Sequence, residues 1–460
     1  MFFRSEFLTR HLFEPLFWRL KSMPVLKQAE KFRSLQYTSV DDFQIRQNVL
    51  LEKILTNAIL NIPYYENFNT SNILLSIKES PKQALLDFPV LSKDDLRYYF
   101  SNMRCDPKNR FFVNSSGGST GKPTRFYQDR NYQISALASI QMFYEWSGKR
   151  SGFRHAVLWG AERDLVKGRM GIKKHFSDYI GNRLTLNAFR LSPERMLEYV
   201  VAINKFKPMC VEGYAQALYE FSQFIVSRQL KVHSPSVIIS SAGTLYKEMR
   251  STIEGAFSSE VFDRYGSREV SAIAAECHEH SGLHVFGETN FVEVVDEDFD
   301  EVSEGQEGEV LVTNLTNFTM PLIRYRIGDR AVKGKMICSC GRPYPLLEKI
   351  VGRSDSSFVT KAGGVVSPEF FIHLIGVMHN DGCIGKFQVI QKDFDSIVLK
   401  LVPSEGRELI NWNAKNKIIE QIQTAMGGVC KVEFRIEEQI EPSPTGKHLH
   451  TISLVKKNKF

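Results

Sequence analysis

The sequence predicts an α/β fold with a large N-terminal α/β domain and a small α+β domain after it. Between residues 110 and 350, short apolar runs alternate with stretches of helical periodicity, which is typical of layered α/β architecture. After Gly352 the pattern changes to strands of period two and two helices. A chain of 460 residues is long enough for one large core and a second, smaller one. We therefore expect domains at residues 1–352 and 353–460, with the boundary near Val351–Ser356.

The elements are expected in the following order along the chain. Up to about residue 110 the pattern is helical, and Pro63 and Pro89 interrupt it because proline cannot continue a helix. The strands expected before residue 350 include Ala156–Trp159, Val237–Ile239 and Glu309–Thr313, and the helices include Pro193–Phe206 and Ala215–Arg228. In the small domain the expected strands are Phe387–Ile390, Ser396–Val402 and Val432–Ile436, and the expected helices are Pro368–Met378 and Ala414–Met426.

Composition and charge exclude several classes of protein. Hydrophobic residues make up 43% of the chain and charged residues 24%, which is ordinary for a globular protein. The net charge of +7 suits anionic substrates, and the chain has no Lys/Arg run of the kind that binds nucleic acid. No segment has the roughly 20 apolar residues that span a bilayer. Seven cysteines without a disulfide-like framework indicate a reducing compartment, so we expect a cytoplasmic protein.

The first 24 residues predict an amphipathic helix. They are rich in Phe, Leu and Trp, but charged side chains such as Arg10, Arg19 and Lys21 interrupt the apolar residues. The segment has neither the apolar block nor the cleavage site of a signal peptide. We expect the helix to dock on the protein's own surface, and the alternative is peripheral contact with a membrane or a partner.

A dense cluster of glycine, hydroxyl and lysine side chains follows the apolar trio Phe111–Val113. The glycines allow backbone N–H groups to converge on one point, and the hydroxyls and the lysine add donors and positive charge for a di- or triphosphate. The spacing excludes a GxxxxGK[ST] P-loop, because Pro123 stands where the Mg²⁺-binding hydroxyl would be. The alternative is a mobile Ser/Gly turn. The candidate phosphate-binding residues are Ser115, Ser116, Gly117, Gly118, Ser119, Thr120, Gly121 and Lys122.

Four downstream segments favour the phosphate-binding interpretation. Tyr265–Glu269 combines an aromatic ring that can stack on a base with a carboxylate that can bind Mg²⁺. Asp329 can accept hydrogen bonds from two ribose hydroxyls. Gly352–Asp355 follows, and Lys447 lies on a tight turn near the C-terminus. Each segment alone also fits a solvated loop, but their joint order along the chain indicates a nucleotide site.

These motifs identify the chain as a member of the adenylate-forming superfamily of acyl-CoA synthetases, adenylation domains and luciferases, which it resembles over nearly its whole length. The phosphate loop resembles the family's Ser/Thr/Gly-rich motif ending in Gly-Lys-Pro. Tyr265–Glu269 resembles its Tyr-Gly-x-x-Glu segment and Tyr325–Asp329 its Tyr-Arg-x-Gly-Asp segment. Gly352–Asp355 resembles the family's hinge, and Lys447 resembles its C-terminal catalytic lysine.

Within the superfamily the chain is most similar to the phenylacetate–CoA ligase branch. Ile62–Tyr65 and Phe88–Lys93 resemble the opening segments of that branch. The Tyr-Gly-Ser-Arg-Glu motif at residues 265–269 resembles that of the CapK-like group, which is associated with capsule and surface-polysaccharide synthesis.

The resemblance implies roles for individual residues. Lys447 would contact the carboxylate and the charge that develops on the α-phosphate, and Glu269 would hold Mg²⁺. Many relatives carry Thr or Ser where this chain has Arg268, which would contact phosphate or pair with a neighbouring carboxylate. The small domain would rotate about Asp355, so that Lys447 serves adenylation only. The other candidate nucleotide-binding residues are Gly243, which matches the adenine-pocket turn, and Tyr265, Gly266, Ser267, Asp329, Arg353 and Asp355.

The implied function is an ATP-dependent ligase that forms an acyl-adenylate, releases pyrophosphate and transfers the acyl group, by default to CoA. The alternative acceptor is an amine of a sugar or lipid-linked glycan. A second class of function is a nucleotide-binding protein without catalytic activity. The acyl pocket is expected to be lined by Tyr144–Trp159, Gly213–Tyr214 and Ala242–Thr244, and the sequence does not name the acid.

Cysteine and histidine residues also suggest a structural zinc site. Cys277 is followed by His280 and His284, and a Cys-x-Cys-Gly turn at Cys338 and Cys340 comes later. Three thiolates and one imidazole would make a tetrahedral site without an open position. We expect His284 as the fourth ligand and His280 as the alternative. Unpaired cysteines in a reduced protein, with surface histidines, are the competing interpretation.

Overall fold

In the computed structural model the described residues are 6–66, 68, 72–105, 111–116, 124–159, 178, 181–188, 191–351, 358–366, 368–375, 383–403, 412–428, 430–440 and 449–455.

The N-terminal helices surround one end of the molecule. Ser39 caps the long helix α4 by accepting from the Asp42 amide, and Ser92 forms a capping box with Asp95 at the start of α8. The predicted helical start of the chain is confirmed. Its elements are α1 (Glu6–Leu8), η1 (Thr9–Phe13), α2 (Glu14–Leu20), α3 (Val25–Leu35), α4 (Val40–Asn61), α5 (Pro63–Glu66), α6 (Ile73–Glu79), α7 (Pro81–Leu85) and α8 (Lys93–Tyr98).

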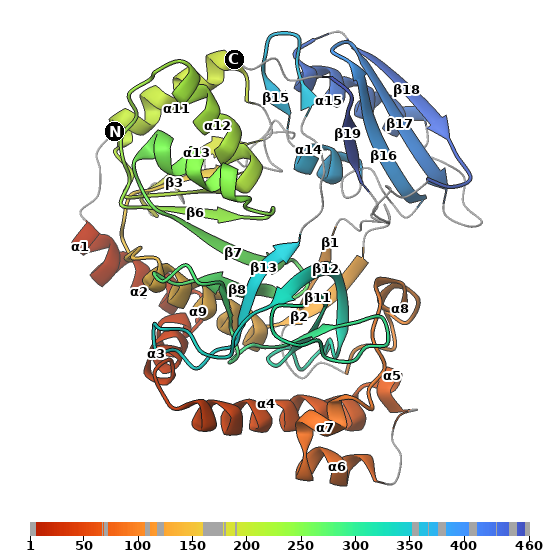
Figure 1. The fold of residues 1–460 in the computed structure, drawn as a ribbon. Helices are drawn as coiled ribbons and strands as arrows, with labels where there is room; N and C mark the ends of the chain where they lie inside the picture. The colour runs from red at the N-terminus through yellow and green to blue at the C-terminus, as the bar shows by residue number, and fades with distance from the viewer. Residues whose placement is uncertain are drawn as a thin grey trace.

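A large mixed sheet forms the centre of the fold, and the predicted alternation of strands and helices is confirmed in its first half (Figure 1). The parallel strands β3 to β7 follow one another along the chain, and a helix separates each consecutive pair from β4 to β7. The side chains of β3, β5 and β6 are mostly buried, as expected for strands covered on both faces. The elements are α9 (Arg130–Trp146), β3 (His155–Trp159), β4 (Arg183–Asn187), α11 (Pro193–Phe206), β5 (Cys210–Tyr214), α12 (Ala215–Ser227), β6 (Val237–Ser241), α13 (Lys247–Phe257) and β7 (Val261–Ser267).

Beyond β7 the same sheet continues with antiparallel strands. Among the described residues its order is β10-β11-β12-β13-β9-β8-β7-β6-β5-β3-β4, so the change from parallel to antiparallel pairing falls between β7 and β8. Of this half, the sequence predicted β11 but not its neighbours. The strands are β8 (Ser271–Glu276), β9 (Leu283–Val285), β10 (Asn290–Val295), β11 (Glu307–Asn314), β12 (Tyr325–Lys333) and β13 (Leu346–Val351).

The C-terminal part carries a separate sheet of order β18-β17-β16-β19 and the short hairpin β14–β15. The three strands and two helices predicted there are confirmed. The last three residues of the helix predicted to end at Met378 lie outside the described part. The expected boundary falls almost wholly on residues 352–357, which lie outside the described part. The elements are β14 (Phe358–Val359), β15 (Val365–Val366), α14 (Pro368–His373), β16 (Ile384–Asp393), β17 (Ser396–Pro403), α15 (Trp412–Met426), β18 (Lys431–Ile436) and β19 (Thr451–Ser453).

The C-terminal part packs on the half of the molecule that carries α11 and α12 (Figure 1). One cluster of buried apolar side chains includes Leu191 and Phe221 of the large domain together with Phe358 and Ile384 of the C-terminal part. A Cβ atom added at Gly364 would lie 3.0 Å from the Cα atom of Ser192, which shows how closely the two backbones approach. In the described residues no helix is both long enough and apolar enough to cross a membrane.

Candidate active site

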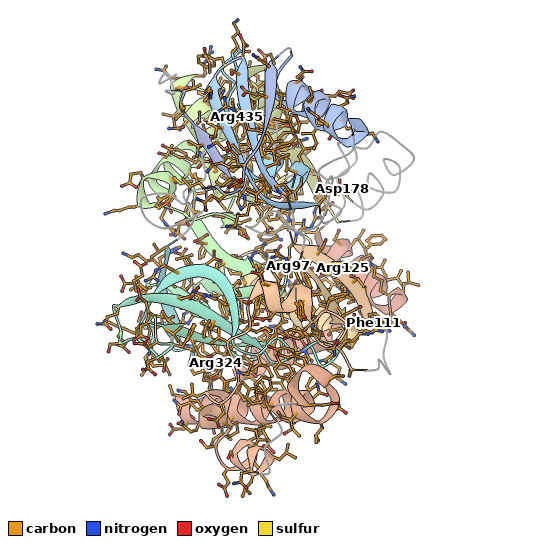
Figure 2. The ribbon with its side chains drawn as sticks, turned by 90° about the vertical axis from the view of Figure 1, so that its right-hand side faces the viewer. Arg97, Phe111, Arg125, Asp178, Arg324 and Arg435 are labelled. Carbon is orange, nitrogen blue, oxygen red and sulfur yellow. The ribbon has the colours of Figure 1, made fainter. Side chains whose placement is uncertain are left out.

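The predicted phosphate loop joins two strands of a hairpin. β1 (Phe111–Ser116) pairs antiparallel with β2 (Thr124–Asp129), and Ser116 lies opposite Thr124. Ser115 and Ser116 therefore end β1 at the mouth of the loop, whereas Gly117, Gly118, Ser119, Thr120, Gly121 and Lys122 lie outside the described residues. Figure 2 labels Phe111 and Arg125 on this hairpin, below the C-terminal sheet that carries Arg435.

The hairpin is tied to the turn that connects β7 and β8. The side-chain amide of Gln128, on β2, donates to the carbonyl oxygens of Arg268 at 2.9 Å and Glu269 at 3.2 Å. In return, Nη1 of Arg268 donates to the carbonyl of Ser115 at 3.2 Å. Two segments more than a hundred residues apart thus hold each other at the start of the phosphate loop, and Arg268 lies beside that loop.

Gly266 occupies a position in this turn that other residues could not take unchanged. A Cβ atom there would lie 2.4 Å from the carbonyl oxygen of Ser271, closer than van der Waals contact allows. The tight turn at the end of β7 therefore needs the glycine, and it brings Ser267, Arg268 and Glu269 to the edge of the sheet.

Glu269 is a buried carboxylate with a defined orientation. Its residue is 4% exposed, and its Oε1 atom accepts a hydrogen bond from the hydroxyl of Tyr325 at 3.2 Å. Tyr325 is fully buried at the start of β12. Burial and the nearby Glu269 raise the pKa of the Tyr132 phenol, so this neighbour stays protonated. A carboxylate held in this way is suited to bind a hard cation such as Mg²⁺.

A second hydrogen bond across the sheet joins Tyr265 to Asp329. The Tyr265 hydroxyl, at the end of β7, donates to Oδ2 of Asp329 on β12 at 3.0 Å. β13, β9 and β8 lie between these two strands in the sheet, so sheet curvature brings the side chains together. The phenol fixes the orientation of the Asp329 carboxylate, which is the acceptor predicted for the ribose hydroxyls.

The carboxyl ends of the parallel strands lie at the same edge of the sheet. Gly243 follows β6 after Ala242, whose φ of 54° is left-handed, and a Cβ atom at Gly243 would approach Ala215 Cβ to 3.4 Å. At the ends of β3 and β5, the rings of Trp159 and Tyr214 lie 4.3 Å apart between centroids. Ligands of open α/β sheets bind at such edges, where the strand order changes direction.

The structure brings Ser115, Tyr265, Glu269 and Asp329 into one hydrogen-bonded region, together with Arg268. Arg353, Asp355 and Lys447 lie outside the described residues, and their roles remain predictions. Tyr325 and Gln128, which orient this region, were missed as contributors from sequence. Tyr325 is the first residue of the recognised Tyr-Arg-x-Gly-Asp segment, so a signal for it existed. Gln128 has none that we can identify.

Four predicted zinc ligands meet in the antiparallel half of the sheet. The ligand atoms of Cys277, His284, Cys338 and Cys340 all lie within 4.8 Å of one another. The Sγ atoms of Cys277 and Cys338 are 3.9 Å apart, and Cys340 Sγ is 3.3 Å from Nε2 of His284. His280 is placed differently, because its Nδ1 lies 3.1 Å from the carboxylate of Glu276.

The surroundings of His284 present its Nε2 atom to the three sulfur atoms. Nδ1 lies 3.2 Å from the carbonyl oxygen of Tyr344. A carbonyl can only accept, so Nδ1 carries the proton and Nε2 keeps its lone pair. Burial lowers the pKa of His284 to about 4, which keeps the ring neutral. A backbone partner that fixes the tautomer in this way is common at histidine ligands of metals.

A buried charged network, which the sequence did not predict, lies beneath β3, β5 and β7. Glu212 receives a hydrogen bond from Arg264 at 2.8 Å and one from the Tyr144 hydroxyl at 2.9 Å, and His155 lies 3.1 Å from it. Nζ of Lys149 is 3.2 Å from the other ring nitrogen of His155. Tyr144, expected near the acyl pocket, therefore directs its hydroxyl into this network.

We expect this network to make the stability of the protein depend on pH through His155. Burial, reinforced by Lys149, lowers the pKa of His155 to about 4. Unfolded histidine titrates near 6.5, so below that pH the unfolded chain binds more protons, and stability falls until the pH reaches about 4. Between pH 7.5 and pH 5 this histidine is expected to remove about 2 kcal/mol from the free energy of unfolding.

Urea unfolding of wild type and a His155→Gln variant at several pH values measures this contribution. Between pH 7.5 and pH 5, the free energy of unfolding should fall more in wild type than in the variant. Any stability advantage of wild type should therefore shrink as the pH falls. His278→Gln is the matched control, because the His278 side chain is 58% exposed. If the difference in free energy of unfolding between wild type and His155→Gln does not change with pH, as for the control, the assignment is contradicted.

The arrangement of sheet, hairpin and C-terminal part defines the class of protein. The fold matches the structure of 2-hydroxyisobutyryl-CoA ligase with 2-HIB-AMP and CoA in its thioesterification state, with a TM-score of 0.59, 20% identity and 91% of each chain covered. Its postadenylation state matches with a TM-score of 0.56, also at 20% identity and 91% coverage. The chain therefore has the fold of the adenylate-forming CoA ligases.

Sequence comparison finds relatives that span most of the chain. It is 24% identical to CapK of Staphylococcus aureus over 416 residues, covering 89% of each chain. It is also 24% identical to phenylacetate–coenzyme A ligase of Thermus thermophilus over 441 residues, covering 89% of this chain and 96% of that one. Residues 358–454 match the CapK C-terminal domain family. CapK and the phenylacetate–CoA ligases are therefore homologues of this chain.

Proposed function

We propose that this protein activates a carboxylic acid with ATP as an acyl-adenylate, releases pyrophosphate, and transfers the acyl group to coenzyme A. The observation that carries the proposal is the hydrogen-bonded region at the carboxyl edge of the sheet. There the mouth of the phosphate loop, Glu269 and Asp329 are held together by Arg268, Tyr325 and Tyr265. Relatives that span most of both chains are CoA ligases.

The chemical difficulty of the first step is the approach of two anions. A substrate carboxylate must attack an α-phosphate that already carries negative charge. Mg²⁺ bound through Glu269 would offset part of this repulsion, as metal ions do in phosphoryl chemistry. Lys122 of the loop and Lys447 of the C-terminal part supply positive charge from the protein, and fixed charges act most strongly where water is excluded.

The residues around these charged groups hold them in place. Tyr325 fixes one oxygen of Glu269, so the carboxylate keeps its position as charge shifts during the reaction. Tyr265 does the same for Asp329 through its hydroxyl. Arg268 anchors the carbonyl at the mouth of the loop, beside the phosphates that the loop would bind. Gly243 offers its backbone for the adenine.

The second step needs a different arrangement, which we assign to the C-terminal part. Residues 353–460 would rotate about Asp355 and withdraw Lys447 once the acyl-adenylate has formed. A change of this kind lets one site serve two half-reactions in turn. The similarity to CapK favours a second candidate acceptor, the amine of a sugar or lipid-linked glycan, in place of coenzyme A.

The experiment that tests the function is pyrophosphate release across a panel of carboxylic acids, with and without coenzyme A. Acid-dependent release accompanied by a CoA thioester is the expected result. Acid-dependent release of pyrophosphate without any CoA thioester would indicate that the acceptor is an amine and not coenzyme A. No acid-dependent release, from a protein that still binds ATP, would contradict the proposal and favour the nucleotide-binding alternative.

We also propose that Cys277, His284, Cys338 and Cys340 bind one structural zinc ion. Three sulfurs and one nitrogen are donors that zinc prefers, and four protein ligands leave no position for substrate. Without a metal, burial raises the pKa of the Cys277 thiol to about 12. A bound cation would instead stabilise thiolates there and join β8, β9 and the loop before β13.

Metal analysis of the purified protein is expected to find about one zinc per chain. A Cys338→Ser/Cys340→Ser double variant should lose the ion and unfold at a temperature lower by several degrees. Cys105→Ser is the matched control, because Cys105 lies outside the cluster and donates to the carbonyl of Phe318. Less than about a tenth of an equivalent in wild type, with loss during purification excluded, would rule out the site.

A further inference from the structure

The first helical segment leaves an apolar face uncovered. α1, η1 and α2 run without interruption from Glu6 to Leu20. We call Leu8, Leu12, Leu16 and Leu20, with Phe7 and Phe17 beside them, the leucine face. All six side chains are exposed, from 37% for Phe17 to 77% for Leu20. In Figure 1 this segment lies at the outer edge of the molecule.

The geometry of the helix keeps these leucines on one side. A spacing of four residues advances the side chain about 40° per step in an α-helix, which has 3.6 residues per turn. The π-helical turn at Thr9–Phe13 has more residues per turn and offsets part of that drift between Leu8 and Leu12. The four leucines therefore form a stripe along the segment.

The opposite side of the same segment is fixed to the large domain. Thr9 is buried, and its hydroxyl accepts a hydrogen bond from the Asn182 side chain at 3.2 Å. Glu14 accepts one from the hydroxyl of Ser151. A Cβ atom at Gly152 would lie 2.5 Å from the carbonyl of Glu6, so the helix backbone touches the domain there. The expected docking on the protein's own surface thus occurs, but through polar and backbone contacts that leave the leucine face outside.

Charge is distributed unevenly around the segment. Arg10, Arg19 and Lys21 are exposed, and so are Lys27 and Lys31 of the neighbouring α3. The exposed carboxylate of α3, Glu30, is paired with Arg33. Both carboxylates of the segment, Glu6 and Glu14, are half-buried against the large domain. The accessible side therefore combines large apolar side chains with positive charge, the combination that binds an anionic lipid surface.

We propose that the leucine face is a peripheral membrane-binding surface selective for anionic lipid. The apolar side chains would enter the boundary between headgroups and acyl chains, and the cations would lie among the phosphates. A second copy of the chain is a poorer occupant, because a two-fold interface sets each patch against itself and would bring Arg10, Arg19 and Lys21 towards the same cations. Binding at this face is independent of the chemistry proposed for the active site.

Vesicle co-sedimentation of the full chain tests the proposal. Wild type is expected to bind phosphatidylcholine vesicles containing about one-third phosphatidylglycerol and to bind pure phosphatidylcholine at least about fivefold more weakly. A Leu12→Ser/Leu16→Ser variant should lose at least about fivefold of the anionic binding. Leu74→Ser/Leu75→Ser is the matched control, because these α6 leucines are also exposed, at 38% and 56%. Its binding should equal that of wild type.

Two further measurements keep the result interpretable. Arg19→Gln/Lys21→Gln, which leaves the leucines in place, should lower binding to anionic vesicles but not to neutral ones. The thermal midpoint of each variant shows whether it is folded. The proposal would be overturned if folded Leu12→Ser/Leu16→Ser and folded Arg19→Gln/Lys21→Gln bound anionic vesicles as tightly as wild type. A dimer in light scattering that the Leu12→Ser/Leu16→Ser change dissociates, while vesicle binding is absent, would also overturn it.

Discussion

Replacing Glu269 by glutamine is expected to lower the rate of acid-dependent pyrophosphate release on the order of a thousandfold. The change removes one negative charge and keeps the size of a side chain that is 4% exposed. Tyr325 can still donate to the amide oxygen, so the packing around β12 is preserved. What is lost is the proposed anionic ligand for Mg²⁺, because a neutral amide binds that ion weakly.

The measurement is pyrophosphate release as a function of Mg²⁺ concentration. Part of the lost rate should return at high Mg²⁺, since the variant binds the metal more weakly but keeps the rest of the site. Glu307→Gln serves as a control, because Glu307 forms an exposed pair with Arg330 at the surface. A Glu269→Gln variant with the wild-type rate and Mg²⁺ dependence would show that another residue holds the metal.

A third variant separates orientation from charge. Tyr325→Phe removes only the hydroxyl that contacts Glu269, so any loss of rate should be much smaller than that of Glu269→Gln. We expect this ranking because Tyr325 only orients Glu269, the residue proposed to bind the metal.

Much of the fold could be predicted because long periodic segments carry their own signal. The helix expected at Pro193–Phe206 has the same bounds in the structure, and Ser192 caps it as helix starts require. The buried strands β3 and β6 were predicted from their short apolar runs. β9 has three residues and β14 two, which is too short for any periodicity to register.

The contacts that make the site functional could not be predicted in the same way. The motifs gave the residue types, but Tyr325 and Glu269 are 56 residues apart and Tyr265 and Asp329 are 64 apart. Such pairs depend on how the sheet curves, which no local pattern encodes. The zinc hypothesis shows the same limit, because only the folded sheet distinguishes His284 beside Cys340 from His280 beside Glu276.

A Lys447→Ala variant is expected to abolish measurable adenylation, with a loss on the order of a thousandfold, while ATP binding is largely retained. The lysine would contact the substrate carboxylate and the charge developing on the α-phosphate, and both contacts strengthen only as the reaction proceeds. In the proposed site, ATP binding would depend instead on the phosphate loop and on the residues around Tyr265 and Asp329. The residue lies outside the described part of the chain, so this expectation rests on the family motif.

The variant also tests whether the C-terminal part changes position between the two steps. Supplied with a preformed acyl-adenylate and coenzyme A, Lys447→Ala should still make thioester at nearly the wild-type rate, because the lysine would be withdrawn during transfer. Lys361→Ala is the control, since Lys361 is an exposed lysine of the same part that pairs with Asp395. Loss of both half-reactions in Lys447→Ala would contradict the alternation, and unchanged adenylation would assign the catalytic role to another lysine.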